Sequence, residues 1–170
     1  MRRPFLGLAV TGLLGAQTPP PCPASHPFAP VTFLEGEWKG AGDGQPGQST
    51  GLATFRFDLE GKVLVRHSHA DDPAANGRPA SHHEDLMTLF SEGGQLKAFY
   101  VDNEGHVIRY LGAEVPGGVA FTSEPASGPR FRLTYLRKAE ALVTVRFEIA
   151  PPSTPTSFKT YLEANTRKVK

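Results

Sequence analysis

Seven ionisable side chains lie on segments in which apolar and polar residues alternate, and they could contribute to a binding site inside the protein. If these segments form a barrel, the charges that become buried must pair, because an isolated charge out of water is very costly. A cavity holding an arginine and a tyrosine among Phe and Leu side chains would suit a small, partly apolar ligand with a carboxylate-like head. The same residues could instead tie neighbouring strands together on the outer face. The seven are Glu84, Asp102, His106, Arg109, Arg132, Glu148 and Tyr161.

The ligand-binding interpretation combines the polar residues that could recognise a head group with the aromatic residues that could hold an apolar body. It predicts a small molecule held inside the barrel without being transformed, so that no residue is assigned a catalytic role. The candidate ligand-binding residues are Trp38, Glu84, His106, Arg109, Tyr110, Arg132, Tyr135 and Tyr161.

The histidines suggest a metal site as an alternative. His67 and His69 are two apart on a predicted strand and share a face, and His82-His83-Glu84-Asp85 begins the strand that follows a loop. If the two strands pair, His67, His69 and His83 could converge with a carboxylate on a divalent metal. The other interpretation is a solvated polar rim, because water reaches the ends of strands.

Catalysis has weaker support. Ser68 and Ser81 are next to histidines, but adjacent side chains on a strand point to opposite faces and cannot form a nucleophile and base pair. Neither a glycine-rich phosphate loop nor the paired histidine motif of zinc proteases is present in the sequence. An acid-base pair such as His106 with Glu84, or His83 with a carboxylate, is the enzymatic alternative, since burial can move such pKa values toward neutrality.

These residues are positioned by short strands. Apolar residues recur with period two, and the segments are separated by glycine, proline and Asp/Asn turns such as Asp58-Leu59-Glu60-Gly61. Ten strands are predicted, over Phe33–Ala41, Thr50–Phe57, Lys62–His69, His82–Phe90, Leu96–Asp102, His106–Gly112, Gly118–Ser123, Arg130–Leu136, Leu142–Ile149 and Ser157–Arg167.

This pattern predicts an all-β fold, an up-and-down antiparallel barrel of about ten strands, with a strongly curved sandwich as the alternative. Val143, Val145 and Phe147 share a face opposite Thr144 and Arg146, as expected when one face of a sheet lines an interior. Trp38, the only tryptophan, is expected to plug one end of that interior. Which face points inward does not follow from the pattern.

Composition limits the possible partners. The chain has 170 residues with 18 basic and 17 acidic side chains that are not segregated, so nucleic acid is not an expected partner. Its 18 glycines and 16 prolines suit many turns. A monomer or a weak dimer through an open barrel edge is expected.

The N-terminus predicts export to the periplasm or the medium. Met1-Arg2-Arg3, an apolar run and Leu14-Gly15-Ala16 have the order of a secretory signal peptide. The predicted domains are a signal peptide over 1–16, with cleavage after Ala24 as an alternative, a proline-rich linker over 17–30 and a barrel over 31–170. Both the Sec and the twin-arginine routes fit, no membrane-spanning segment is expected, and Cys22 has no disulfide partner within the chain.

The motif Gly36-x-Trp38-x-Gly40-x-Gly42 resembles the opening signature of calycin barrels. From about Val31 to Lys170 the chain looks most like an uncharacterised exported bacterial lipocalin-like family and is distantly similar to nitrobindin-like barrels. The first likeness rests on five stretches, namely Asp58–Arg66, His83–Met87, Asp102–Tyr110, Pro129–Tyr135 and Tyr161–Ala164. It implies a calycin fold and no particular activity.

Nitrobindin-like barrels carry a haem-ligating histidine before Leu-x-Ala on their last strand. The matching residue here is Tyr161, in Tyr161-Leu162-Glu163-Ala164. Tyrosinate can ligate ferric haem when a cation lowers its pKa. Haem is therefore an alternative cofactor, with Tyr161 as an ordinary barrel residue and no cofactor as the main interpretation.

Overall fold

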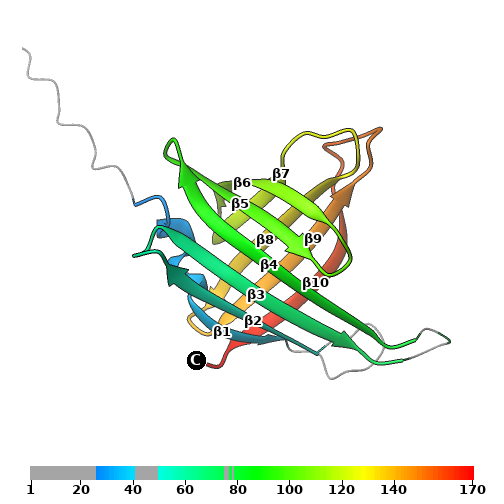
Figure 1. Cartoon of the computed structure of the whole chain (residues 1–170), viewed down its shortest axis with the longest axis horizontal. Helices are drawn as coiled ribbons and strands as arrows, with labels where there is room; N and C mark the ends of the chain where they lie inside the picture. The colour runs from blue at the N-terminus through cyan, green and yellow to red at the C-terminus, as the bar shows by residue number, and fades with distance from the viewer. Residues whose placement is uncertain (1–25, 41–49, 75–76, 78) are drawn as a thin grey trace, which may run out of the picture.

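The computed structural model describes residues 26–40, 50–74, 77 and 79–170 as a closed antiparallel barrel (Figure 1). The predicted signal peptide, its cleavage sites and Cys22 lie outside the described residues. The strands are β1 Gly36–Gly40, β2 Thr50–Asp58, β3 Val63–Asp72, β4 Ser81–Glu92, β5 Gln95–Asp102, β6 Val107–Val115, β7 Gly118–Ser123, β8 Arg130–Ala139, β9 Leu142–Ala150 and β10 Lys159–Lys168.

The first strand closes the ring. Trp38 of β1 is opposite Ala53 of β2 on one side and Lys168 of β10 on the other, and every other strand pairs with its neighbours in the chain. The predicted up-and-down barrel is therefore confirmed, and the sandwich alternative is wrong. Because the ring of described strands is closed, it has no open edge at which an edge-to-edge dimer could form.

Hairpin turns keep the strands in register, as the sequence predicts. The backbone carbonyl of Asp58 accepts hydrogen bonds from the N–H groups of Gly61 and Lys62, and Gly61 has a φ of 79°. This left-handed conformation is the one that glycine adopts without steric cost. The tight turn joins β2 to β3 and places Leu64 directly opposite Phe57.

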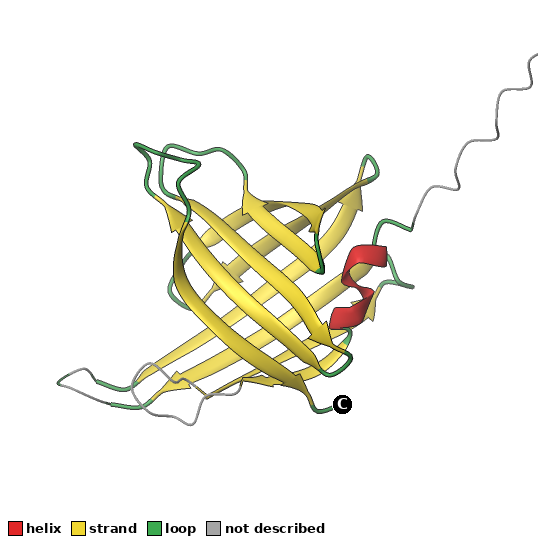
Figure 2. Ribbon diagram, turned by 180° about the vertical axis from the view of Figure 1, so that it is seen from behind, coloured by secondary structure: helices red, strands yellow, loops and turns green. Residues whose placement is uncertain are grey.

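One element differs from the sequence prediction. Residues Ala29–Leu34 form a 3-10 helix, η1, whereas the sequence assigned Ala29 and Pro30 to the linker and Phe33 and Leu34 to the first strand. A 3-10 helix has three residues per turn, so Phe28, Val31 and Leu34 fall on one face. All three are buried. The helix lies at one end of the barrel (Figure 2). Six residues are too few for this period to stand out in a sequence.

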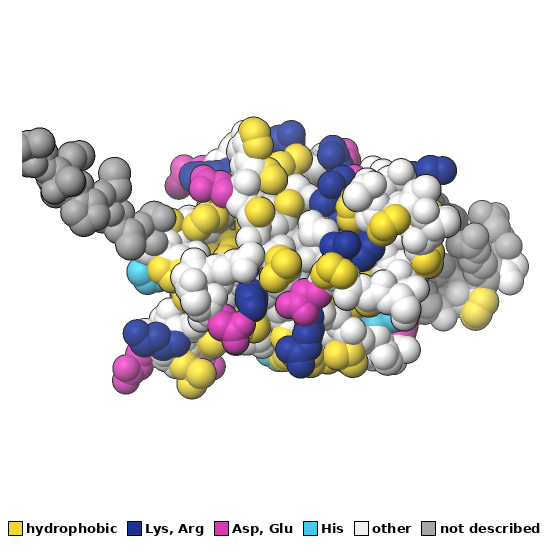
Figure 3. All heavy atoms as spheres, turned by 90° about the horizontal axis from the view of Figure 1, so that it is seen from above, with side chains coloured by type: hydrophobic (Ala, Val, Ile, Leu, Met, Phe, Trp, Pro, Cys, Tyr) yellow, Lys and Arg dark blue, Asp and Glu magenta, His cyan; other side chains and the backbone are white. Residues whose placement is uncertain are grey.

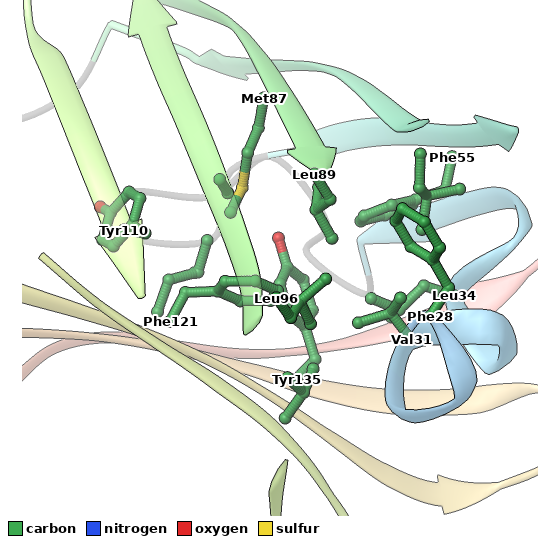
Figure 4. Packing of buried hydrophobic residues seen from close by; sticks show 14 of the residues in the cluster. Phe28, Val31, Leu34, Phe55, Met87, Leu89, Leu96, Tyr110, Phe121 and Tyr135 are labelled. Atoms are coloured by element: carbon green, nitrogen blue, oxygen red, sulfur yellow. The ribbon is translucent and has the colours of Figure 1, made fainter. Parts of the chain in front are cut away.

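The core is continuous from η1 into the barrel. Trp38 is 2% exposed, and its indole N–H donates to the Leu34 carbonyl at 2.6 Å. The Phe28 ring contacts Phe57 edge-on, with 5.6 Å between ring centroids. Figure 4 shows side chains of η1 packing beside Phe55 and Leu89. The η1 end is thus filled, and the half of the barrel away from η1 is called the distal half below.

Several strands are longer than predicted. β3 and β4 pair as far as Asp72 and Ser81, beyond the predicted strand ends at His69 and His82. Backbone hydrogen bonds continue a ladder whatever the side chains are, so polar residues did not end these strands. Among the described residues, no helix has the length and apolar character needed to cross a bilayer.

Candidate functional site

A buried ion pair occupies the middle of the barrel. Arg66 on β3 donates through Nη2 to both oxygens of Asp85 on β4, at 2.5 and 2.6 Å, and through Nε at 3.0 Å. Its Nη1 contacts the Tyr135 hydroxyl of β8 across the interior. Burial by itself would lower the pKa of Arg66, but Tyr135 and Asp85 outweigh it and raise that pKa. Arg66 therefore stays charged, and its guanidinium is bound by Asp85 and Tyr135.

A second polar group lies beyond this pair in the distal half. Asp102 on β5 is directly opposite Asp85, so two carboxylates face each other across neighbouring strands. Such like charges repel. Arg66 neutralises Asp85, and Asp102 accepts from the Tyr100 hydroxyl at 3.0 Å and pairs with His106 Nδ1 at 2.8 Å.

The turn after β5 holds Asp102 in place. Asp102 Oδ1 accepts the backbone N–H groups of Glu104 at 3.0 Å and His106 at 2.9 Å. Burial opposes ionisation, but the hydrogen bonds from the backbone and the ring of His106 and from Tyr100 lower the pKa of Asp102. Asp102 is therefore a carboxylate at neutral pH, although its side chain is only 3% exposed.

His83 on β4 joins the two groups. Its Nε2 lies 3.2 Å from the Tyr100 hydroxyl and 3.6 Å from Asp85 Oδ2, and its Nδ1 lies 3.2 Å from Glu104 Oε1. His83 is opposite Ala70 and two residues from Asp85, so it faces inward. Burial raises the pKa of Tyr100, which therefore keeps its proton.

The opposite side of the distal half is apolar. Strands β9 and β10 stand five places from β4 and β5 around the ring of ten. Val145 is opposite the inward-facing Tyr135, and Ala164 is opposite Val145, so both point inward. Both are only partly buried, as is Phe147, in contrast to the fully buried residues near η1. Water therefore reaches inward-facing apolar surface in the distal half.

A bulge modifies this apolar wall. Register shifts between Thr160 and Leu162, so Tyr161 is an extra residue in β10. Its ring lies edge-on to Phe147, with 6.2 Å between centroids, and it is 75% exposed. Two bulged residues oppose one partner, which re-aims a side chain. Tyr161 thus lies beside the apolar wall, away from the polar group on β4 and β5.

The predicted ligand-binding residues divide into three sets. Trp38, Tyr110 and Tyr135 are buried inside, and His106 and Tyr161 lie at the distal end. The other three lie on the outer face, where Glu84 is 69% exposed, Arg109 lies over the Phe99 ring and Arg132 pairs with Glu148 at 2.6 Å. These three do not line the interior, because each is next in sequence to an inward-facing residue.

This placement corrects two expectations about charge. Arg109 and Arg132 are outside, so they do not offer an anionic head group a binding site in the interior. The inward arginine is Arg66, and Asp85 already neutralises it. His106 pairs with Asp102, and Glu84 is not its partner.

The metal site expected from His67, His69 and His83 is not assembled. β3 and β4 do pair, but His67 is opposite Leu86, His69 is opposite Glu84, and His83 is opposite Ala70. Successive residues alternate between faces, so the first two histidines point outward while His83 points inward. The His69 ring stacks on His82 instead, with 6.5 Å between centroids.

Sequence reasoning missed Arg66, Asp85 and Tyr100 as site residues. The signal was present: Arg66 shares its face with Leu64, as Asp85 does with Met87, and both of those apolar residues are fully buried. A charge in phase with apolar residues on a strand indicates burial with a partner.

The outer surface carries no segregated charge on the face drawn in Figure 3, where basic and acidic side chains are interspersed. Two shallow hollows lie outside the barrel among the described residues. One lies between η1 and the β4–β5 turn, and the other lies beside Asp71 and His82. Neither includes the polar group around Asp102.

Comparison with known proteins adds no identity: no protein-family model matches this chain, and no curated protein matches its sequence.

Proposed function

We propose that this protein is an exported barrel of the lipocalin-like calycin type that binds a small, partly apolar molecule in its distal half. The observation that carries the proposal is the pair of opposed walls there. Val145, Phe147 and Ala164 present water-accessible apolar surface, and Tyr100 and His83 on the far side present polar groups. Binding sites for small molecules combine apolar walls with a few convergent polar groups in this way.

The closed meander and the buried Trp38 of the Gly36-x-Trp38-x-Gly40 motif support the calycin assignment. The order of charged, apolar and small residues at the N-terminus supports export. Neutral Tyr100 and ionised Asp102 favour a ligand head that donates or shares a hydrogen bond over a carboxylate, because Asp102 would repel a second anion.

Binding is tested by filling the proposed site. Ala164→Phe places a ring between the walls, and Ala113→Phe is the matched control on the outer face, where Ala113 is opposite Ala120 and exposed. Nile red, a neutral apolar fluorophore, serves as the probe. We expect Ala164→Phe to weaken its binding by about tenfold or more, equivalent to about 1.4 kcal/mol. Ala113→Phe should leave binding unchanged.

Equal binding by both variants would place the probe outside the distal half and refute the proposed site. Native mass spectrometry of protein isolated from its own periplasm identifies the natural ligand. A thermal unfolding curve for each variant shows that the barrel is intact.

A second candidate function is acid-base catalysis by His106. Its Nδ1 lies 2.8 Å from Asp102 Oδ2, a contact that fixes the tautomer of a general base. Under this alternative a lumenal substrate would be transformed, and His106→Gln would abolish turnover without loss of binding. Under the first proposal, the ligand extracted from the wild-type protein is unchanged after incubation.

A further inference from the structure

The contact between His83 and Glu104 is not explained by binding of an organic molecule. His83 Nδ1 lies 3.2 Å from Glu104 Oε1. His83, Asp102 and Glu104 each offer one ligand atom to a group in which all such atoms lie within 4.8 Å of one another. His83 comes from β4, Asp102 from the end of β5 and Glu104 from the turn that follows. The β-ladder between β4 and β5 therefore brings one imidazole and two carboxylates to the same place.

The hydrogen bonds around His83 determine where its proton lies. Tyr100 gives its hydroxyl proton to Asp102, so its oxygen is an acceptor for His83 Nε2 at 3.2 Å. Asp85 Oδ2, at 3.6 Å from the same nitrogen, is also an acceptor. Both neighbours require the proton of His83 on Nε2.

A neutral imidazole then has only a lone pair on Nδ1. That lone pair faces the Glu104 carboxylate, which also has no proton to donate when it is ionised. His83 Nδ1 and the Glu104 oxygen are then both hydrogen-bond acceptors, and two acceptors at this distance repel unless a cation lies between them. The cation is either a second proton on His83 or a metal ion.

We propose that His83 Nδ1, Glu104 and Asp102 bind a divalent first-row transition metal such as Zn²⁺. Imidazole with carboxylates is a donor set for zinc and its neighbours. In a tetrahedral site with bonds of about 2.0–2.1 Å, two ligand atoms are about 3.3 Å apart. The separation of 3.2 Å between His83 Nδ1 and Glu104 Oε1 fits this value.

The groups behind these ligands also suit a metal. A metal-bound histidine characteristically donates its other N–H to a carboxylate or a neighbouring oxygen, which orients the ring. His83 Nε2 faces Tyr100 and Asp85 in this way, and Asp85 is held by Arg66. Asp102 keeps its backbone hydrogen bonds through Oδ1 and the bond from Tyr100 through Oδ2, so the metal would take Oδ2 in place of His106.

The site differs from the one expected from the sequence. It uses His83 with two residues of the β5–β6 hairpin, and it excludes His67 and His69. Three protein ligands leave a fourth position for water, as in other zinc sites of this type.

The test is titration of the untagged full chain with Zn²⁺ by calorimetry and with Co²⁺ by visible absorption. We expect one equivalent to bind. His83→Gln and Glu104→Gln should each weaken binding by at least about tenfold, because loss of even an outer-shell partner has an effect of that size. Binding should also weaken as pH falls, because metal ligands bind in their deprotonated forms.

The matched controls are His69→Gln and His82→Gln, which alter the stacked imidazoles of the outer face. They should leave binding unchanged, as should Cys22→Ser, which removes the single thiol. Glu104 is an exposed turn residue, so Glu104→Gln keeps the fold even if His83→Gln does not.

Three results would overturn the proposal. They are no binding at micromolar Zn²⁺, the same affinity in Glu104→Gln as in the wild type, or loss of binding in either control histidine variant. None of these results depends on Nile red binding, so the metal site and the ligand site are tested separately.

Discussion

Arg66 and Asp85 form a two-pronged ion pair inside the barrel, with Arg66 Nη2 at 2.5 and 2.6 Å from the two oxygens of Asp85 and neither side chain more than 10% exposed. The pair stands between the filled η1 end and the distal half, and it reaches Tyr135 on the far wall. Its charges cancel, so it ties three strands together without leaving a net charge in the interior.

Removing one member of this pair should be far more harmful than removing both. Asp85→Asn leaves the Arg66 charge without a counterion, and we expect a loss of about 3–5 kcal/mol in the free energy of unfolding. The double variant Arg66→Met, Asp85→Leu should recover most of this loss, because neither charge of the pair is left buried without its partner. Urea unfolding followed by far-UV circular dichroism measures both, and a double variant less stable than Asp85→Asn would contradict the argument.

Trp38 should couple η1 to the barrel. Trp38→Phe removes the indole N–H that bonds the Leu34 carbonyl at 2.6 Å. The unsatisfied carbonyl should cost about 1–3 kcal/mol. In Trp38→Phe, the backbone amides of residues 28–34 should exchange hydrogen faster than in the wild type, and this increase should be larger than that of the amides in the strands.

The control for Trp38 is Lys168→Met, which removes only the ammonium that lies 5.6 Å from the centre of the indole ring. Its effect should be about 0.5–1 kcal/mol. Equal protection of η1 in Trp38→Phe and the wild type would show that the helix is held by its own apolar face alone.

Glu148 should make stability depend on pH. Its hydrogen bond with Arg132 lowers the pKa of Glu148 in spite of burial. The pKa of a glutamate in the unfolded chain is about 4.3. A carboxyl whose pKa is lower in the folded protein stabilises the fold at pH values above that unfolded pKa. This contribution disappears as the pH falls through the pKa of the folded state. The wild type should therefore be more stable than Glu148→Gln at pH 7, and the difference should shrink below about pH 4.

The matched control is Glu163→Gln on the same outer face. Glu163 also pairs with an arginine, Arg146, but is 45% exposed compared with 9% for Glu148. An exposed pair contributes less than about 1 kcal/mol. Urea midpoints between pH 3 and pH 8 check this, and a difference for Glu148→Gln that grows on acidification would have the wrong sign.

Export should leave a shortened chain. The N-terminal pattern predicts that protein recovered from the periplasm begins at Gln17, or at Ser25 if cleavage follows Ala24. Intact-mass measurement and N-terminal sequencing distinguish the two. Full-length protein confined to the cytoplasm would contradict the prediction.

The fold followed from local signals. Alternation at Val143, Val145 and Phe147 marks a two-faced strand, and the turn at Asp58–Gly61 sets the hairpin. Both signals arise within a few residues, where side-chain direction is determined by the chain itself. The sequence pattern did not predict the 3-10 helix, because Phe28, Val31 and Leu34 form one buried face only when the end of a barrel covers them.

The interior was decided by tertiary structure. Arg66 shares a face with Leu64 and is buried against Asp85, whereas Arg132 alternates with Phe131 and Leu133 and pairs with Glu148 outside. A period-two pattern defines two faces but does not say which one becomes concave. Trp38 lies opposite both Ala53 and Lys168, and this closure of the ring decides which face of each of the ten strands points inward. His83 is thereby placed beside Glu104, and His67 and His69 lie on the outer surface.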